Sequence, residues 1–253
     1  MTQSITWLPL VAAIIILGAL ALATEVGYRF GRRAVRHHEA PASGPVGAIQ
    51  GAMLGLLGLL LGFSFAGAAG RFMERQDLII REANAIGTAY LRADLLDEPH
   101  AAHLRTSLAE YVRHRIAVSR TLHRGLSAET EAQIQAHHAA IWSAARDGAL
   151  AKPAALVAVL GPVNETIDLH ALRIAAGRKH LPALVLGLLA GCSLLAMAVI
   201  GYGCGLSGRR SRPMTWSLSF LVGAALWTTL DLDYPRIGLV RLSDAPLHQL
   251  RLD

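Results

Sequence analysis

Residues 51–71 have the sequence Gly51-Ala-Met-Leu-Gly-Leu-Leu-Gly-Leu-Leu-Leu-Gly-Phe-Ser-Phe-Ala-Gly-Ala-Ala-Gly-Arg71. The twenty residues before the arginine carry no charge. As a helix that rises about 1.5 Å per residue, they are long enough to cross the hydrocarbon core of a bilayer. The segment is therefore predicted to be a transmembrane helix.

Small residues recur along this predicted helix at spacings of three and four, which places them on one side of it. They are Gly51, Gly55, Gly58, Gly62, Ala66 and Gly70. In lipid, where apolar area alone does not drive helices together, a small-residue face is typical of close helix–helix contact. The face is expected either to pack tightly against other helices or to line a narrow passage.

Three further apolar segments have membrane character, at residues 7–28, 181–206 and, more briefly, 214–230. Aromatic residues lie near their ends, where amphipathic rings favour the headgroup layer. No Lys or Arg precedes the first apolar run, and the run is too long for a secretory signal peptide. The sequence thus predicts four transmembrane helices.

Between the second and third spans, residues 71–180 carry apolar residues at helical spacing. Helices are expected to begin near Pro99 and Pro153 and to end near Gly125 and Gly148. The predicted fold class is an all-α membrane protein, with four transmembrane helices and a helical extramembrane bundle inserted between the second and third.

Four parts follow from this organisation. They are the first transmembrane pair with its basic loop (1–70), the helical domain (71–180), the second transmembrane pair (181–231) and a C-terminal turn and tail (232–253).

The formal net charge of +6 does not indicate nucleic-acid binding. Seven of the 24 Lys and Arg residues lie in the two short loops between spans, where anionic lipid accounts for them. The segment 71–180 is nearly balanced, with 14 basic and 12 acidic residues. The lipid bilayer is therefore an expected partner, and nucleic acid is not.

Motifs of catalytic and metal centres are missing from the sequence. Cys192 and Cys204 lie in one span and form neither a disulfide framework nor a metal motif. The eleven histidines include no His-Glu-x-x-His arrangement, and neither a phosphate loop nor a Gly-x-Ser-x-Gly elbow occurs. We expect no enzyme activity, no cofactor and no metal site.

Arginines in the two short loops predict the orientation of the chain. They are Arg29, Arg32, Arg33 and Arg36 in the first loop and Arg209, Arg210 and Arg212 in the other. Because short basic loops face the cytoplasm, both termini and the helical domain are expected on the outer side of the membrane.

Two blocks of sequence carry a family resemblance. One runs from Leu61-Gly-Phe63 to Arg71-Phe, then Arg75, and then Glu82-Ala-Asn-Ala-Ile-Gly-Thr-Ala-Tyr-Leu-Arg92. The other is Asp231-x-Asp233-x-Pro235-x-x-Gly238-Leu. Together they resemble the bestrophin-like domain family of bacterial membrane proteins. The resemblance implies a bacterial inner-membrane protein, whose helical domain the arginine loops would place in the periplasm.

A more distant similarity is to the bestrophins themselves, which are pentameric ion channels. Their second helix carries a pattern that Phe63, Arg71 and Phe72 match. In bestrophins this Phe belongs to a hydrophobic constriction of the pore, which implies the same role for Phe63. The other constriction positions, bulky in bestrophins, fall on Gly55 and Leu59 here. Bestrophins also keep the inserted domain in the cytoplasm, opposite to the orientation that the loops predict.

The candidate site residues form three groups. Pore-lining or constriction candidates are Phe63, Leu59, Gly55, Gly58 and Gly62. Candidates for an ion vestibule, or for a structural or solvated polar face, are Arg71, Arg75, Asp77, Arg81, Glu82, Asn84 and Arg92. The exit motif, expected to form a structured turn, consists of Asp231, Asp233, Pro235 and Gly238.

Glu82 differs from the other polar candidates because it adjoins the apolar residues Ile79 and Ile86. Burying an unpaired carboxylate is costly, so an arginine from a neighbouring helix or subunit is expected beside it. Asp77 and Arg81, by contrast, are spaced to pair one turn apart on a solvated face.

Two functional hypotheses follow. The first is an oligomeric ion channel, a pentamer by resemblance, with the second span around the axis and inorganic ions as the permeant species. The second is a non-conducting membrane scaffold or sensor whose helical domain binds a partner.

The orientation can be tested with reporter fusions. Fusions after Arg36 and after Arg210 are expected to report the cytoplasm, and a fusion near Gly125 the outer side, because the short arginine loops stay inside. A cytoplasmic signal from the Gly125 fusion would instead support the bestrophin orientation.

Overall fold

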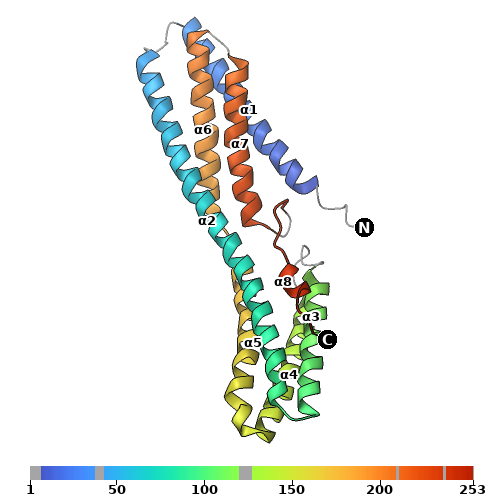
Figure 1. Cartoon of the computed structure of the whole chain (residues 1–253). Coiled ribbons are helices and arrows are strands. Elements are labelled where there is room, and N and C mark those ends of the chain that lie inside the picture. The colour runs from blue at the N-terminus through green and yellow to red at the C-terminus, as the bar shows by residue number, and fades with distance from the viewer. Residues whose placement is uncertain (1–6, 38–42, 120–126, 209–210, 236–237, 253) are drawn as a thin grey trace. The chain divides into compact units, whose positions relative to one another are not determined.

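The computed structural model describes residues 7–37, 43–119, 127–208, 211–235 and 238–252, which form helices and turns without a strand. The longer helices are α1 (Trp7–Arg36), α2 (Ser43–Arg92), α3 (His100–Ser119), α4 (Ala128–Ala151), α5 (Leu156–Arg178), α6 (Ala183–Ser207) and α7 (Arg212–Asp233) (Figure 1). Shorter elements are the 3₁₀ turns η1 (Ala93–Leu95) and η3 (Pro153–Ala155) and the helix α8 (Ala245–His248). The predicted all-α class is confirmed for the described residues.

The chain divides into two compact units. The first comprises residues 1–72 and 180–241, and the second comprises residues 73–179 and 242–253. The long helix α2 contributes to both. The second unit thus contains residues 73–179 of the predicted helical segment and residues 242–253 of the predicted C-terminal part, whereas residues 232–241 of that part lie in the first unit.

Three helical stretches are long and apolar enough to cross a membrane, at residues 9–36, 45–95 and 153–207. They contain the second and third predicted spans and all but the first two residues of the first. Helix α7 covers the fourth predicted span, but its Ser, Thr and Trp residues lower its mean hydropathy and it is not among the three. The fourth span therefore remains a prediction.

Proline and serine set helix starts in the second unit. Helix α3 begins directly after Pro99, and Pro153 opens the turn η3 that leads into α5. The N-cap of α4 is Ser127, whose Oγ accepts a hydrogen bond from the Thr130 amide at 3.1 Å. The predicted helix end at Gly125 lies outside the described residues.

The predicted end of a helix at Gly148 is wrong, since α4 continues to Ala151. A Cβ at position 148 would lie 2.7 Å from Leu96 Cδ1 and 2.9 Å from His100 Cβ. Gly148 is therefore a packing residue, which lets α4 approach the η1–α3 corner closely.

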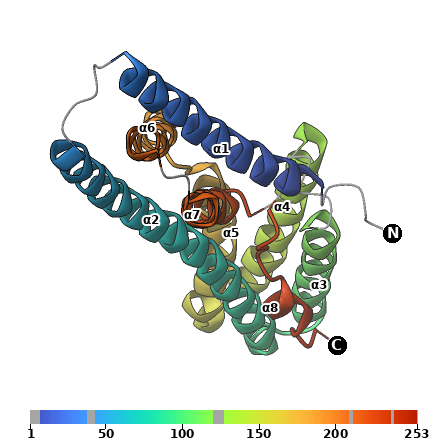
Figure 2. The ribbon, with the colours of Figure 1, turned by 90° about the horizontal axis from the view of Figure 1, so that it is seen from above.

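In the first unit, helices α1 and α6 make an unusually close backbone contact. A Cβ added at Gly27 or Gly31 of α1, or at Gly201 or Gly205 of α6, would lie within 3 Å of a carbonyl oxygen of the other helix. Real Cβ atoms do not approach so closely, so the two backbones meet only because these positions are glycines. Figure 2 shows α6 and α7 between α1 and the first part of α2.

The first part of α2 buries one stripe and leaves another open. Leu57, Leu61 and Ala68 are buried, and Gln50 Nε2 donates to the Val199 carbonyl of α6 at 2.9 Å. The glycines of the opening segment lie away from this stripe, and a Cβ at Gly51, Gly55, Gly58, Gly62 or Gly70 would meet no described residue within 4 Å. Among the described residues of one chain, this glycine face makes no tight contact, and both alternatives, packing against other helices and lining a passage, stay predictions. The close contact is made by α1 and α6 instead.

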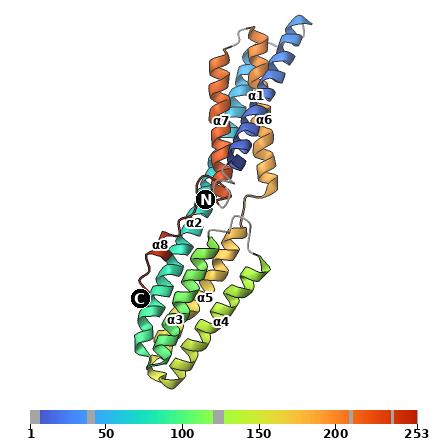
Figure 3. The same ribbon diagram turned by 90° about the vertical axis from the view of Figure 1, so that its right-hand side faces the viewer.

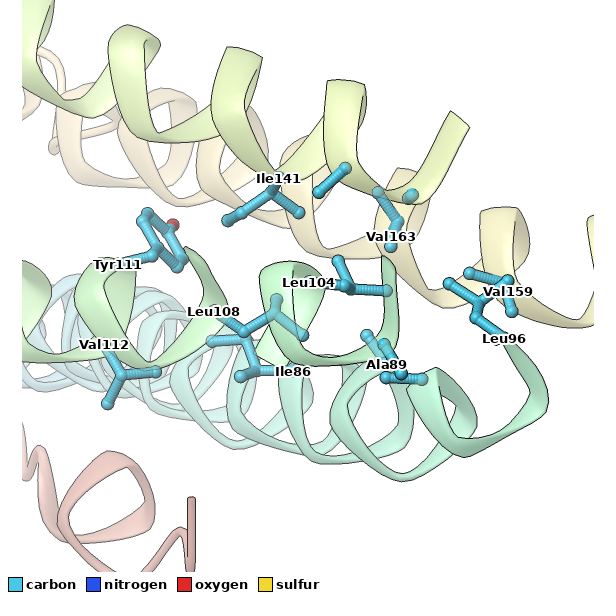
Figure 4. Packing of buried hydrophobic residues seen from close by; sticks show 14 of the residues in the cluster. Ile86, Ala89, Leu96, Leu104, Leu108, Tyr111, Val112, Ile141, Val159 and Val163 are labelled. Atoms are coloured by element: carbon cyan, nitrogen blue, oxygen red, sulfur yellow. The ribbon is translucent and has the colours of Figure 1, made fainter. Parts of the chain in front are cut away.

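In the second unit, α3, α4 and α5 lie alongside the last part of α2 (Figure 3). Their apolar faces form one core, in which Ile86, Leu104, Leu108, Ile141 and Val163 are buried completely (Figure 4). Along α2 the core residues Ile79, Ala83, Ile86 and Ala89 recur every third or fourth position, which is the pattern of a helix that buries one face. The C-terminal tail adds Leu247, also buried, to this core.

The α1–α6 contact predicts a strong asymmetry between two glycines of the same helix. Gly201→Ala is expected to destabilise the protein by about 1–3 kcal/mol, because the new Cβ would force the Thr24 carbonyl away. Gly187→Ala, where nothing lies within 4 Å, is expected to be neutral or slightly stabilising. Thermal unfolding of the two variants in detergent measures the difference. Equal melting temperatures would contradict the contact.

Candidate functional site

The pore-lining candidates lie together on the open face of α2. The side chain of Phe63 is 70% exposed and that of Leu59 is 57% exposed. A Cβ at Gly55, Gly58 or Gly62 would also meet no described atom within 4 Å. The arrangement gives α2 an apolar surface that the rest of the first unit does not cover.

At the end of this segment, Arg71 joins the exit motif. Its Nε donates to Oδ1 of Asp233 at 2.8 Å, and its Nη2 lies 2.8 Å from the same oxygen. The Asp233 side chain is fully buried and also accepts from the Leu181 amide at 2.9 Å, just before α6. His180 lies beside it, with its ring stacked on Tyr234 at 4.3 Å. Arg71 thus ties α2 to the α6–α7 ends, and it is not a free vestibule charge.

The rest of the exit motif forms the structured turn that its sequence predicts. The Asp231 carboxylate accepts from the backbone amides of Leu239 and Val240, each at 2.8 Å. A Cβ at position 238 would lie 2.5 Å from Asp231 Oδ1, so the turn needs Gly238 for the close approach. Pro235 is buried in the same turn.

Arg75 is a buried structural residue. Its guanidinium donates to the carbonyls of Ala176, at 3.1 Å from Nε, and of Lys179. These carbonyls lie at the C-terminal end of α5, where backbone oxygens lack intrahelical partners and the helix dipole favours a cation. Arg75 therefore caps α5.

The remaining polar candidates lie on a solvated face. Asp77, Arg81 and Asn84 are exposed, and Arg92 Nη1 donates to the Ala158 carbonyl at 2.9 Å. The i,i+4 ion pair expected between Asp77 and Arg81 is not formed between these two described side chains. Exposed charges separated by water contribute little to stability.

Glu82 is the centre of a buried ion cluster in the second unit. Its side chain has no exposed surface. Oε1 accepts from the Tyr111 hydroxyl at 2.7 Å and from Arg115 Nε at 3.2 Å. Arg115 Nη2 reaches Oε2 at 3.4 Å, and Arg173 Nη1 also pairs with Oε2. The structure thus supplies the arginine partner expected for Glu82, from α3 and again from α5.

Electrostatics favour the ionised form of this carboxylate. Burial by itself would raise the Glu82 pKa, but Arg115, Arg173 and the Tyr111 hydroxyl outweigh it and lower the pKa to about 2. Burial and the neighbouring Glu82 raise the pKa of Tyr111, so its hydroxyl stays protonated and donates. The carboxylate is therefore ionised at every physiological pH.

Two histidines extend this cluster, and the sequence analysis did not identify them. His138 of α4 lies 5.1 Å from Tyr111 and 5.0 Å from His170 of α5, measured between ring centroids. A signal was present in the sequence, because Arg115 and His138 interrupt positions where the helical period requires apolar side chains. Among the described residues, no three His, Cys, Asp or Glu side chains are placed to hold a metal ion.

The ion cluster predicts a large cost for removing its carboxylate. Glu82→Gln is expected to destabilise the protein by about 3–5 kcal/mol, because two buried arginines lose their counter-charge. Glu74→Gln is the control, since the exposed Glu74–Lys179 pair contributes at most about 1 kcal/mol.

The lowered Glu82 pKa gives the sign of the pH dependence. The carboxylate stabilises the folded state above its ordinary pKa of 4.5, and this contribution is lost as the pH falls towards 2. Denaturant unfolding of the wild type and Glu82→Gln over that range measures it. Equal stabilities of the wild type and the Glu82→Gln variant at pH 7 would contradict this account.

Comparison with known proteins agrees with the two sequence blocks that this site contains. No curated protein and no solved structure matches the chain. The family model of the Bestrophin-like domain matches residues 17–247, which include most of both units and every candidate residue. With a match over most of its length, and with three helices suited to a bilayer, the chain belongs to the Bestrophin-like domain family of membrane proteins.

Proposed function

We propose that this protein is a multi-pass membrane protein that assembles around a conducting pore lined by α2. The open face of α2 is the observation that carries the proposal. Phe63 and Leu59 are more than half exposed there, and no described residue lies within 4 Å of a Cβ placed at Gly55, Gly58 or Gly62. An apolar face with small residues is suited to contact between helices of several copies.

In such an assembly the exposed apolar side chains would face the axis. A ring of phenyl groups from Phe63 makes a constriction that a hydrated ion enters only at a high cost, and such constrictions gate by dewetting. The glycines leave room on either side of that ring. Permeant inorganic ions and a pentameric ring, both implied by the similarity to bestrophins, are part of the proposal.

The salt bridge of Arg71 assigns it a supporting role in this pore. Its guanidinium is engaged by the buried Asp233 carboxylate, so its charge is largely compensated where α2 leaves the apolar segment. We place the four-span topology, the bacterial inner membrane and the periplasmic helical unit in the same proposal. They rest on the arginine loops and on α7, which occupies the fourth apolar segment.

Single-channel recording of the purified assembly in planar bilayers tests the pore. Phe63→Ala is expected to raise the conductance, or to open a silent pore, because it widens the constriction without altering a charge. Phe65→Ala is the matched control. It removes a phenyl ring two residues further along α2. Because each residue turns the helix by about 100°, this ring points about 160° away from that of Phe63. The conductance should therefore stay unchanged.

The outcomes separate the two functional hypotheses. Equal conductances for the two Phe variants would remove Phe63 from the constriction. Silence of the wild type and Phe63→Ala, with the oligomer intact by mass measurement, would favour the non-conducting scaffold or sensor. A monomer in detergent and in lipid would contradict the assembly itself.

A further inference from the structure

Two histidines in the core of the second unit have buried ring nitrogens without a hydrogen-bond partner among the described residues. His138 of α4 is 5% exposed and His170 of α5 is 2% exposed. Their rings meet edge to face, with 5.0 Å between centroids. Neither His138 Nε2 nor either ring nitrogen of His170 is bonded to a described group. A buried polar atom without a partner is costly, and a protonated ring there would be more costly still.

The charged groups around the pair come from α2, α3, α4 and α5. Helix α2 supplies Glu82, α3 supplies Arg115, and α5 supplies Arg173. Glu131 and His137 act from α4 itself. The nearest carboxylate, Glu82, already binds two arginines and the Tyr111 hydroxyl. A proton on either ring would therefore add positive charge where two guanidinium groups share one carboxylate.

A second, more exposed pair continues outward from the first. The rings of His114 on α3 and His137 on α4 lie 5.0 Å apart, and His114 Nε2 is also buried without a described partner. Burial and His137 lower the His114 pKa. Helix α4 thus presents neighbouring histidines, at 137 and 138, to α3 and α5.

We propose that the His138–His170 pair is an acid-sensitive switch, in which proton uptake loosens α4 from α5 and opens the helical unit. This inference does not depend on the channel proposal. It assigns a response to pH to the unit that holds neither the apolar face of α2 nor the exit motif.

The direction of the response follows from the titration of the two rings. Burial, Arg115 and the neighbouring His138 lower the His170 pKa from 6.5 to about 4, and burial chiefly lowers the His138 pKa as well. An opened unit with ordinary histidines binds more protons between these values, so stability is lost as the pH falls from about 6.5 towards 4. At pH 5.5, His170 alone raises the equilibrium constant for opening about tenfold.

Hydrogen–deuterium exchange on the full chain in detergent micelles tests the switch. Protection factors, corrected for the intrinsic exchange rate at each pH, are compared at pH 7.5 and 5.5 for peptides from α4 and α5. Protection in the wild type is expected to fall about tenfold at pH 5.5. Glu82 stays ionised over this range, so its salt bridges do not contribute to the change.

Three variants distinguish the pair from other titrating groups. His170→Phe keeps a ring in the core and cannot take up a proton, so the fall in protection should be reduced to a few-fold or less. His170→Gln gives the same test with a polar side chain if the Phe variant is poorly folded at pH 7.5. His103→Gln, on the exposed side of α3, should retain the full tenfold fall.

A wild type with equal protection at the two pH values would overturn the proposal without any variant. An equal fall in the wild type and in a folded His170 variant would also overturn it, since another group would then be responsible.

Discussion

Glu82 is a charged group in the middle of an apolar helical unit, and its neighbours are arranged to keep it charged. Moving a carboxylate out of water is expensive, and only close opposite charge and hydrogen bonds offset the cost. Arg115 from α3 and Arg173 from α5 supply the charge, and Tyr111 supplies a hydroxyl. Because the partners come from different helices, the carboxylate is satisfied only when α2, α3 and α5 are packed together. The ion cluster thus selects one arrangement among the many that a purely apolar core would allow.

The same cluster limits what can surround it. Its arginines make the neighbourhood positive, and the buried histidines beside it are therefore held neutral. A core that must exclude protons in order to stay packed is a physical basis for a response to acid. Apolar residues at positions 138 and 170 could pack in the same core without responding to acid. The histidine pair therefore adds a sensitivity to pH that stability alone does not require.

In the first unit the helices associate in another way, because in lipid the burial of apolar surface gives little driving force for helix association. Glycines at positions 27 and 31 of α1 and at 201 and 205 of α6 let the two backbones touch, and dispersion over this close contact stabilises the pair. The glycines of α2 recur at a similar spacing, three and four residues apart, yet no described helix meets them. This difference between two glycine stripes is the physical reason for proposing that α2 meets other copies of the chain.

Helical periodicity and long apolar segments, which depend only on local geometry, determined the all-α class and three helices of membrane length, and the two sequence blocks indicated the family. The sequence also determined that Glu82 needed an arginine and that Asp231–Gly238 formed a turn, because the costs of burying a charge and of crowding a backbone are local. Only the tertiary structure decided which arginines pair with Glu82. It also decided that Arg71 meets Asp233, which is 162 residues away in the sequence. The glycines of α1, α2 and α6 recur at similar spacings, so the sequence does not show which of them form a close contact. Gly148 likewise suggests a helix end in the sequence, and only the structure shows that it packs against Leu96. Spacing along a helix says which residues share a face, whereas what that face meets depends on contacts between segments far apart in the chain.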